Sequence, residues 1–171
     1  MASSTLKTVL GFVKSVFKRW VPVGSDSTSI RDIYNFLPIE NLFATSGQPS
    51  ERQFDLIHSA GYETVINLAP TSMLENSVVN ESEILSALGM NYIHIPVDFK
   101  NPTEDDFTQF VQSVRENADQ KVWVHCAANM RVSAFTYRYR RAVLGVEEAS
   151  AVSDLQKIWN PVGVWKKFIS P

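Results

Sequence analysis

The sequence predicts an α/β domain in which helices flank a central, mostly parallel sheet of four to five strands. Short apolar runs alternate along the chain with segments of helical periodicity, a pattern typical of parallel strands joined by helices. The 171 residues are 44% hydrophobic and 20% charged, so the chain can bury a core and is not a disordered protein. We expect an N-terminal segment, residues 1–29, followed by one folded domain, residues 30–171.

The N-terminal segment has the pattern of a basic amphipathic helix. Its charged residues Lys7, Lys14 and Lys18 fall opposite an apolar face whose members recur at i, i+3, i+4 and i+7. Residues 1–25 carry four basic residues and no acid, which leaves 12 basic and 18 acidic residues in the remainder. The predicted apolar face consists of Leu6, Val9, Leu10, Val13, Val16, Phe17 and Trp20.

This segment is too short in its uncharged stretches to cross a bilayer, and it lacks a secretory cleavage pattern, so we expect a cytoplasmic protein. Two interpretations of the apolar face stay open. It either packs on the domain, or it attaches residues 1–23 to the periphery of an anionic membrane or to an acidic partner. In the second case residues 1–23 are separable from catalysis.

Capping residues and glycines delimit the elements of the domain. A strand at 42–46 precedes a helix that the capping pair Ser50 and Gln53 opens and Gly61 ends, and a buried strand follows at 64–68. The later elements repeat this logic. They are a helix from the pair Asn80 and Glu83 to Gly89, a strand at 92–95, a helix from the pair Thr103 and Asp106 to Asn117, a strand at 121–125, and helices at 131–144, 147–159 and 162–169.

The only cysteine, Cys126, lies where the last strand gives way to a helix, five residues before Arg131. Ligands collect at the carboxyl ends of parallel strands, and a helix N-terminus presents unpaired N–H groups that favour anions. Both this field and Arg131 favour the thiolate, which is the nucleophilic form of cysteine. The alternative is that Cys126 is an inert core residue, because free cysteines are often buried.

The loop after Cys126 suits a tetrahedral oxyanion. Ala127 and Ala128 are small enough for the backbone to curl, and Asn129 is a residue type that tolerates positive φ. The amides from Ala127 to Met130 then point inward, and the planar guanidinium of Arg131 holds two oxygens of the anion.

An acid on the preceding connection adds a proton donor. Asp98 directly follows the strand at 92–95, so it emerges at the same sheet edge as Cys126 and suits a general acid. Asp105 and Asp106 are competitors, but their place in the first turn of a helix already gives them a structural role. Tyr137, Tyr139, Trp159 and Trp165 are expected to be packing groups.

His125-Cys126, Arg131 and the Asp98 loop resemble the cysteine-based protein tyrosine and dual-specificity phosphatase superfamily. Similarity is greatest to a bacterial branch of compact phosphatase-like proteins and extends over residues 30 to 169. The segments Thr45-Ser46-Gly47-Gln48-Pro49, Thr64-Val65-Ile66-Asn67-Leu68 and Ile95-Pro96-Val97 match that branch. The resemblance implies a small phosphatase fold and a metal-independent cysteinyl-phosphate mechanism, with Cys126 as nucleophile, Arg131 as phosphate clamp, Asp98 as general acid and His125 as modulator of the thiolate.

The loop departs from the superfamily pattern in three ways. It has four residues between Cys126 and Arg131 where five are usual, it has Asn129 where a glycine is expected, and it has Val132 where a hydroxyl residue is usual, with Ser133 one place later. A four-residue gap also resembles rhodanese-type sulfurtransferases, which would carry a persulfide on Cys126. A third hypothesis is a non-catalytic phosphate-binding module.

Other classes of ligand are less compatible with the sequence. A formal net charge of −2 provides no global basic field for nucleic acid, which we do not expect as a partner. His58, His94 and His125 have no metal-ligand spacing, so we expect neither a metal nor a cofactor. The expected partner is a phosphorylated protein or small-molecule substrate.

Overall fold

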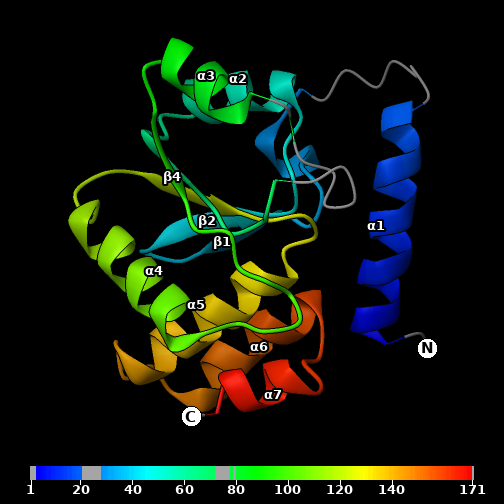
Figure 1. Cartoon of the computed structure of the whole chain (residues 1–171), viewed down its shortest axis with the longest axis vertical. Coiled ribbons are helices and arrows are strands. Elements are labelled where there is room, and N and C mark those ends of the chain that lie inside the picture. Colours follow the sequence, from blue (N-terminus) through cyan, green and yellow to red (C-terminus); the bar gives the residue numbers. More distant parts are fainter. Residues whose placement is uncertain (1–2, 21–27, 72–77, 79, 171) are drawn as a thin grey trace.

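The computed structural model describes residues 3–20, 28–71, 78 and 80–170. Its centre is a five-stranded sheet in the order β1-β2-β5-β3-β4 (Figure 1). The pairs β2 with β5, β5 with β3, and β3 with β4 are parallel, whereas β1 pairs antiparallel with β2. The predicted α/β class and mostly parallel sheet are therefore confirmed. The strands are β1 (Leu37–Ile39), β2 (Phe43–Ser46), β3 (Thr64–Asn67), β4 (Asn91–His94) and β5 (Val122–His125).

Helices cover both faces of this sheet, as Figure 1 shows. One face carries α2 (Glu51–Ser59), α3 (Glu81–Ala87) and the 3-10 turn η1 (Ile30–Asp32). The other face carries α4 (Glu104–Glu116), α5 (Met130–Ala142), α6 (Glu148–Ile158) and α7 (Val164–Phe168).

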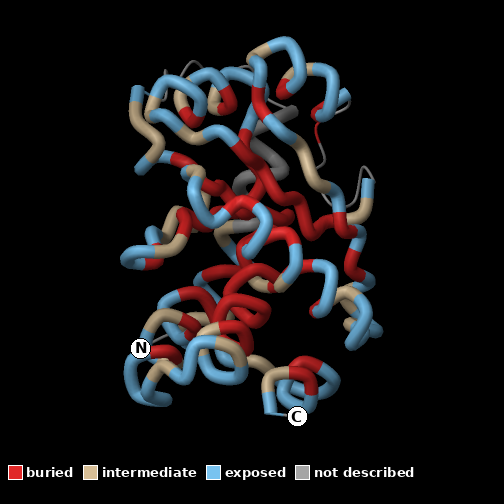
Figure 2. The backbone as a smooth tube through the Cα atoms, turned by 90° about the vertical axis from the view of Figure 1, so that its left-hand side faces the viewer, coloured by how far each residue is buried: buried red, intermediate tan, exposed pale blue. Residues whose placement is uncertain are grey.

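The alternation of side chains along β5 divides the interior into two cores. Val122 and Val124 pack with the helices α4 to α7, whereas Trp123 packs with α2 and α3. Figure 2 shows the buried backbone concentrated in the centre of the molecule. Because successive side chains point to opposite faces, Cys126 joins the Val124 core and His125 faces the α2 and α3 side. The four predicted packing aromatics, Tyr137, Tyr139, Trp159 and Trp165, are all buried.

Two of the three predicted capping pairs are confirmed. Ser50 with Gln53 and Thr103 with Asp106 form reciprocal capping boxes at α2 and α4. The Asn80 prediction is wrong, because this residue has a φ of 66° and makes no side-chain cap. A capping side chain needs an extended backbone at its own position, which the left-handed conformation of Asn80 does not provide. Strand β1 was not among the predicted elements, since its three residues are too few to show a period.

The N-terminal helix is confirmed as α1 (Ser4–Trp20), which runs along one flank of the domain and contacts α6. Of the predicted apolar face, the structure describes the side chains of Leu6, Val9, Leu10 and Val13. Among the described residues, none of the helices has both the length and the apolar character needed to cross a bilayer. The remaining predicted positions, namely Lys14, Val16, Phe17, Lys18 and Trp20, have side chains outside the described set.

Candidate active site

Cys126 lies at the carboxyl end of β5, directly after the last strand residue, His125. Its backbone N–H donates to the carbonyl of Ser46 at 3.3 Å, so the neighbouring strand β2 fixes the start of the loop. The cysteine is 1% exposed, and Ala127 and Ala128 are buried with it. The predicted nucleophile is therefore at the base of a tightly packed loop.

Asn129 turns this loop into α5. Its φ of 64° is left-handed, which explains why an asparagine can stand where the superfamily pattern has a glycine. The side-chain amide of Asn129 donates to the carbonyl of Asn35 at 2.8 Å and to Oγ1 of Thr45 at 3.0 Å, and Nδ2 of Asn35 donates to the carbonyl of Ala128 at 3.0 Å. The Asn129 side chain therefore does not cap α5, and the first-turn amides of this helix have no side-chain cap.

Gly47 permits the close approach of β2 to the loop. It forms a bridge with Ala128, and its N–H donates to the carbonyl of Tyr34 at 2.7 Å. A Cβ atom on this residue would lie 2.7 Å from Cδ1 of Tyr34 and 3.0 Å from the carbonyl oxygen of Ala127. Only glycine therefore fits without displacing the loop.

Arg131 is the second residue of α5 and is 3% exposed. Its guanidinium carbon lies 5.1 Å from the centre of the Phe99 ring, within the range of a cation–π contact. Phe99 packs against Trp159 and Trp165 in turn, and Nε1 of Trp165 donates to the Phe99 carbonyl at 2.8 Å. This packing connects the arginine to the loop that follows β4.

Asp98 precedes Phe99 in that same loop, so the contact between Phe99 and Arg131 brings the Asp98 segment next to the start of α5. The Asp98 side chain is exposed, and its Oδ1 accepts the N–H of Lys100 at 2.9 Å. Asp106 instead accepts the N–H of Thr103 at 2.9 Å as part of its capping box. Asp106 therefore has the structural role predicted for it, which is to cap α4.

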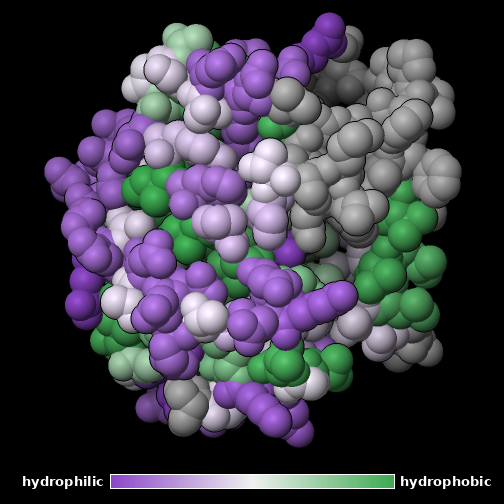
Figure 3. Space-filling model, viewed as in Figure 1, coloured by the Kyte–Doolittle hydropathy of each residue, from purple (hydrophilic) through white to green (hydrophobic). Residues whose placement is uncertain are grey.

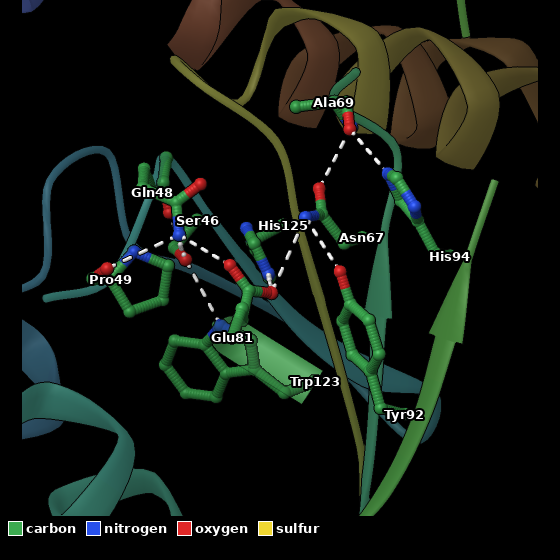
Figure 4. A network of polar contacts seen from close by, with 11 residues as sticks. Ser46, Gln48, Pro49, Asn67, Ala69, Glu81, Tyr92, His94, Trp123 and His125 are labelled. Atoms are coloured by element: carbon green, nitrogen blue, oxygen red, sulfur yellow. Dashed lines mark hydrogen bonds and ion pairs between the residues drawn. The ribbon is translucent and has the colours of Figure 1, made fainter. Parts of the chain in front are cut away.

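His125 belongs to a buried polar network on the opposite face of the sheet from Cys126 (Figure 4). Its Nε2 lies 2.8 Å from Oε1 of Glu81, the first residue of α3. The other carboxylate oxygen of Glu81 accepts Nε2 of Gln48 at 2.9 Å, and Oε1 also accepts Nδ2 of Asn67 at 3.3 Å. Because an ionised carboxylate only accepts, the His125 proton on this side sits on Nε2.

Glu81 was not among the site residues predicted from the sequence. Burial by itself would raise the pKa of this carboxyl, but the charge of His125 and the hydrogen bonds from His125 and Gln48 outweigh it and lower the pKa. Tyr92, whose hydroxyl lies 3.2 Å from Nδ2 of Asn67, has its pKa raised to about 12 by burial and by the charge of Glu81. A hollow of about 270 Å³ lies beside this network, lined in part by Asn67, Glu81, Tyr92 and His94.

Neither of the two residues after Arg131 takes the place of the hydroxyl residue that the superfamily pattern has there. Val132 is fully buried in the core. Ser133 donates its hydroxyl to the carbonyl of Met130 at 3.0 Å and accepts Nε1 of Trp159 at 3.2 Å. These two hydrogen bonds of the Ser133 hydroxyl are therefore with α5 and with the core.

Known proteins resemble this chain in sequence and in fold. The model of the family described as "DSP-PTPase phosphatase fused to NAD+ Kinase" matches residues 13–161. A structure from Shewanella putrefaciens CN-32, assigned as a DUF442 phosphatase, superposes with a TM-score of 0.70 at 31% identity and covers 82% of this chain and 92% of that chain. Pseudomonas aeruginosa TpbA bound to pTyr has the same fold, with a TM-score of 0.60 at 14% identity over 79% of this chain and 78% of that chain.

One curated relative is a beta-lactamase hydrolase-like protein of Xylella fastidiosa, 32% identical over 95 residues, which are 54% of this chain and 22% of that protein. The chain spans less than a third of the length of the curated relatives it matches. Since the family model covers most of the chain and the solved DUF442 structure shares its fold, the chain belongs to the DSP-PTPase family of the cysteine-based tyrosine and dual-specificity phosphatase superfamily.

Proposed function

We propose that this phosphatase domain hydrolyses phosphomonoesters through a cysteinyl-phosphate intermediate on Cys126. The observation that supports the proposal most strongly is the loop between β5 and α5. A buried cysteine begins it, a left-handed Asn129 turns it, and a buried arginine in the first turn of α5 follows it. The first-turn amides without a side-chain cap and the guanidinium of Arg131 are the groups that a phosphate dianion requires.

In the first step the Cys126 thiolate attacks phosphorus, a P–S bond forms and the bond to the leaving oxygen breaks. Asp98 donates its proton to that oxygen, so the alcohol leaves neutral. The loop amides and Arg131 bind the three equatorial oxygens, whose charge is redistributed in the transition state. The side chain of Asn129 holds the loop in this shape through Asn35 and Thr45.

In the second step a water molecule attacks phosphorus and the P–S bond breaks. The Asp98 carboxylate accepts a proton from that water, which returns the acid to its starting form and releases inorganic phosphate. The thiolate is regenerated as the leaving group. His125 precedes Cys126 in the chain, and Glu81 sets the orientation of its ring on the other face of the sheet, so we expect it to modulate the thiolate only through the backbone that the two residues share.

The test is hydrolysis of an activated aryl phosphate and of phosphotyrosine by the purified chain, with and without a chelator. We expect turnover that survives the chelator and disappears in Cys126→Ser. Acid quenching during turnover should trap phosphate on the wild-type protein and none on Cys126→Ser. Activity that depends on added metal, or full activity in the variant, would contradict the mechanism.

The sulfurtransferase hypothesis predicts thiocyanate formation from thiosulfate and cyanide, so the same preparations should be assayed for it. A persulfide carrier has no leaving alkoxide to protonate, and the Asp98 loop packed beside Arg131 therefore favours phosphate chemistry. A non-catalytic module would bind vanadate or phosphate without turning over either ester.

A further inference from the structure

Helix α1 attaches to the domain through small and polar residues. The hydroxyl of Thr8, which is 4% exposed, donates to the carbonyl of Ile158 at the end of α6. The backbone N–H of Asn160 donates to Oγ1 of Thr5 at 2.8 Å, and its side-chain amide donates to Oγ of Ser4 at 3.1 Å. The face of α1 that contains Ser4, Thr5 and Thr8 is therefore the docked face.

Tyr34 also holds the docked face of α1 against the domain. Its hydroxyl donates to the backbone carbonyl of Thr8, and a Cβ atom on Gly11 would lie 2.9 Å from the Tyr34 ring. Thr8 and Gly11 are three residues apart and so lie on one side of the helix. With both of them directed at the domain, the rotation of α1 about its own axis is defined.

This rotation directs the apolar face away from the domain. Leu6, Val9, Leu10 and Val13 are 49, 44, 52 and 45% exposed, and their spacing places them on one face. Figure 3 shows the resulting hydrophobic surface along the outer edge of the molecule where α1 lies. An amphipathic helix usually buries its apolar face on the core, so the attachment seen here is the reverse of the packing expected for a structural helix.

The charges of the segment indicate what covers this face. Residues 1–25 carry four basic residues and no acid, and Lys7 is exposed next to Leu6. If α1 of a second copy packed against this face, like charges would come together, whereas an anionic lipid surface would complement them. One face of four aliphatic side chains, on a helix whose charged residues are all basic, is the composition of a helix that lies in the interface plane of a bilayer.

We propose that α1 binds the surface of an anionic membrane by inserting Leu6, Val9, Leu10 and Val13 between the lipids, while its polar face stays attached to the domain. Tyr34 contacts both α1 and Gly47, so hydrogen bonds connect the membrane-bound helix to the segment beside the Cys126 loop. The proposal requires no hydrolysis at Cys126, and it is tested by binding alone.

The experiment is sedimentation of the full chain with vesicles of phosphatidylcholine alone and of phosphatidylcholine with phosphatidylserine. We expect binding to the anionic vesicles that weakens as salt is raised. Replacing all four residues, Leu6→Gln, Val9→Gln, Leu10→Gln and Val13→Gln, should lower the partition coefficient about a hundredfold or more, since the insertion of apolar surface is lost. Glutamine keeps the helix propensity of the segment, and these side chains are exposed, so thermal unfolding should stay unchanged.

The matched control removes exposed apolar side chains elsewhere. Leu144→Gln, Val162→Gln and Val164→Gln alter residues that are 42, 68 and 45% exposed outside α1, and the combined variant should bind anionic vesicles like the wild type. A second variant, Lys7→Glu, should weaken binding to anionic vesicles. Failure of the wild type to bind, or equal losses in the two multiple variants, would overturn the proposal. Concentration-dependent dimerisation that the α1 variant abolishes, without vesicle binding, would assign the face to a second copy instead.

Discussion

Oε1 of Glu81 lies 2.8 Å from Nε2 of His125, although the two residues are 44 positions apart and come from α3 and β5. Both are buried, at 5% and 0% exposed. This pair connects β5, the strand that precedes Cys126, to α3. It also fixes which ring nitrogen of His125 carries the proton facing α3.

Glu81→Gln should destabilise the protein by about 1.5–3 kcal/mol at pH 7, because a charged hydrogen-bond acceptor is lost from a buried network. The wild-type pKa of Glu81 is lowered in the folded state, so its charged form stabilises the fold above about pH 4.5, its ordinary value, and this contribution is lost as the pH falls through the folded-state pKa. Urea unfolding at pH 7 and pH 4 should show the difference between wild type and variant shrink at the lower pH.

The control for this variant is Glu83→Gln, which alters an exposed carboxylate on the same helix. It should change the free energy of unfolding by less than about 0.5 kcal/mol at either pH. A difference between wild type and Glu81→Gln that stays constant with pH would show that the charge of Glu81 contributes nothing to the fold.

Gly47→Ala should destabilise the protein by about 1–3 kcal/mol and reduce phosphatase activity, because the added methyl group meets the Tyr34 ring and the carbonyl of Ala127. Thermal unfolding and kcat/KM for an aryl phosphate measure the two effects. The double variant Gly47→Ala with Tyr34→Ala removes the closer contact. Its loss in free energy of unfolding should be smaller than the sum of the losses in the two single variants. Wild-type kinetics in Gly47→Ala would mean that the loop shape tolerates a shift of β2.

Arg131→Lys should lower kcat/KM for phosphate esters about 10²- to 10³-fold, because an ammonium group cannot bind two phosphate oxygens in the planar manner of a guanidinium. Arg140→Lys is the matched control on the same helix. Arg140 contacts Asp154 at 2.6 Å on α6, and this variant should keep full activity. Steady-state kinetics and phosphate release measure both, and equal activity in the two variants would place the substrate anion elsewhere.

Strands β2 to β5 and the loop that follows Cys126 could be predicted from the sequence because their signals are local. Apolar runs, capping pairs and the position of Cys126 before a helix are all read within a few residues. The Glu81 partner of His125 was missed because it depends on the pairing of β3 with β5 and on the placement of α3, which no local pattern encodes. The rotation of α1 was open for the same reason, since Thr8 and Gly11 become contacts only through Tyr34 and α6.

Asp98→Asn should slow alkyl and tyrosyl phosphates about 10²- to 10⁴-fold and an activated aryl phosphate much less, because only a leaving group of high pKa needs a proton as its bond to phosphorus breaks. The basic limb of the pH-rate profile should also disappear. Asp105→Asn changes an exposed carboxylate at the start of α4 and should leave both substrates and the profile unchanged. Equal losses on the two substrates with an unaltered profile would show that Asp98 serves the loop through its contact with Lys100 and that the proton comes from another group.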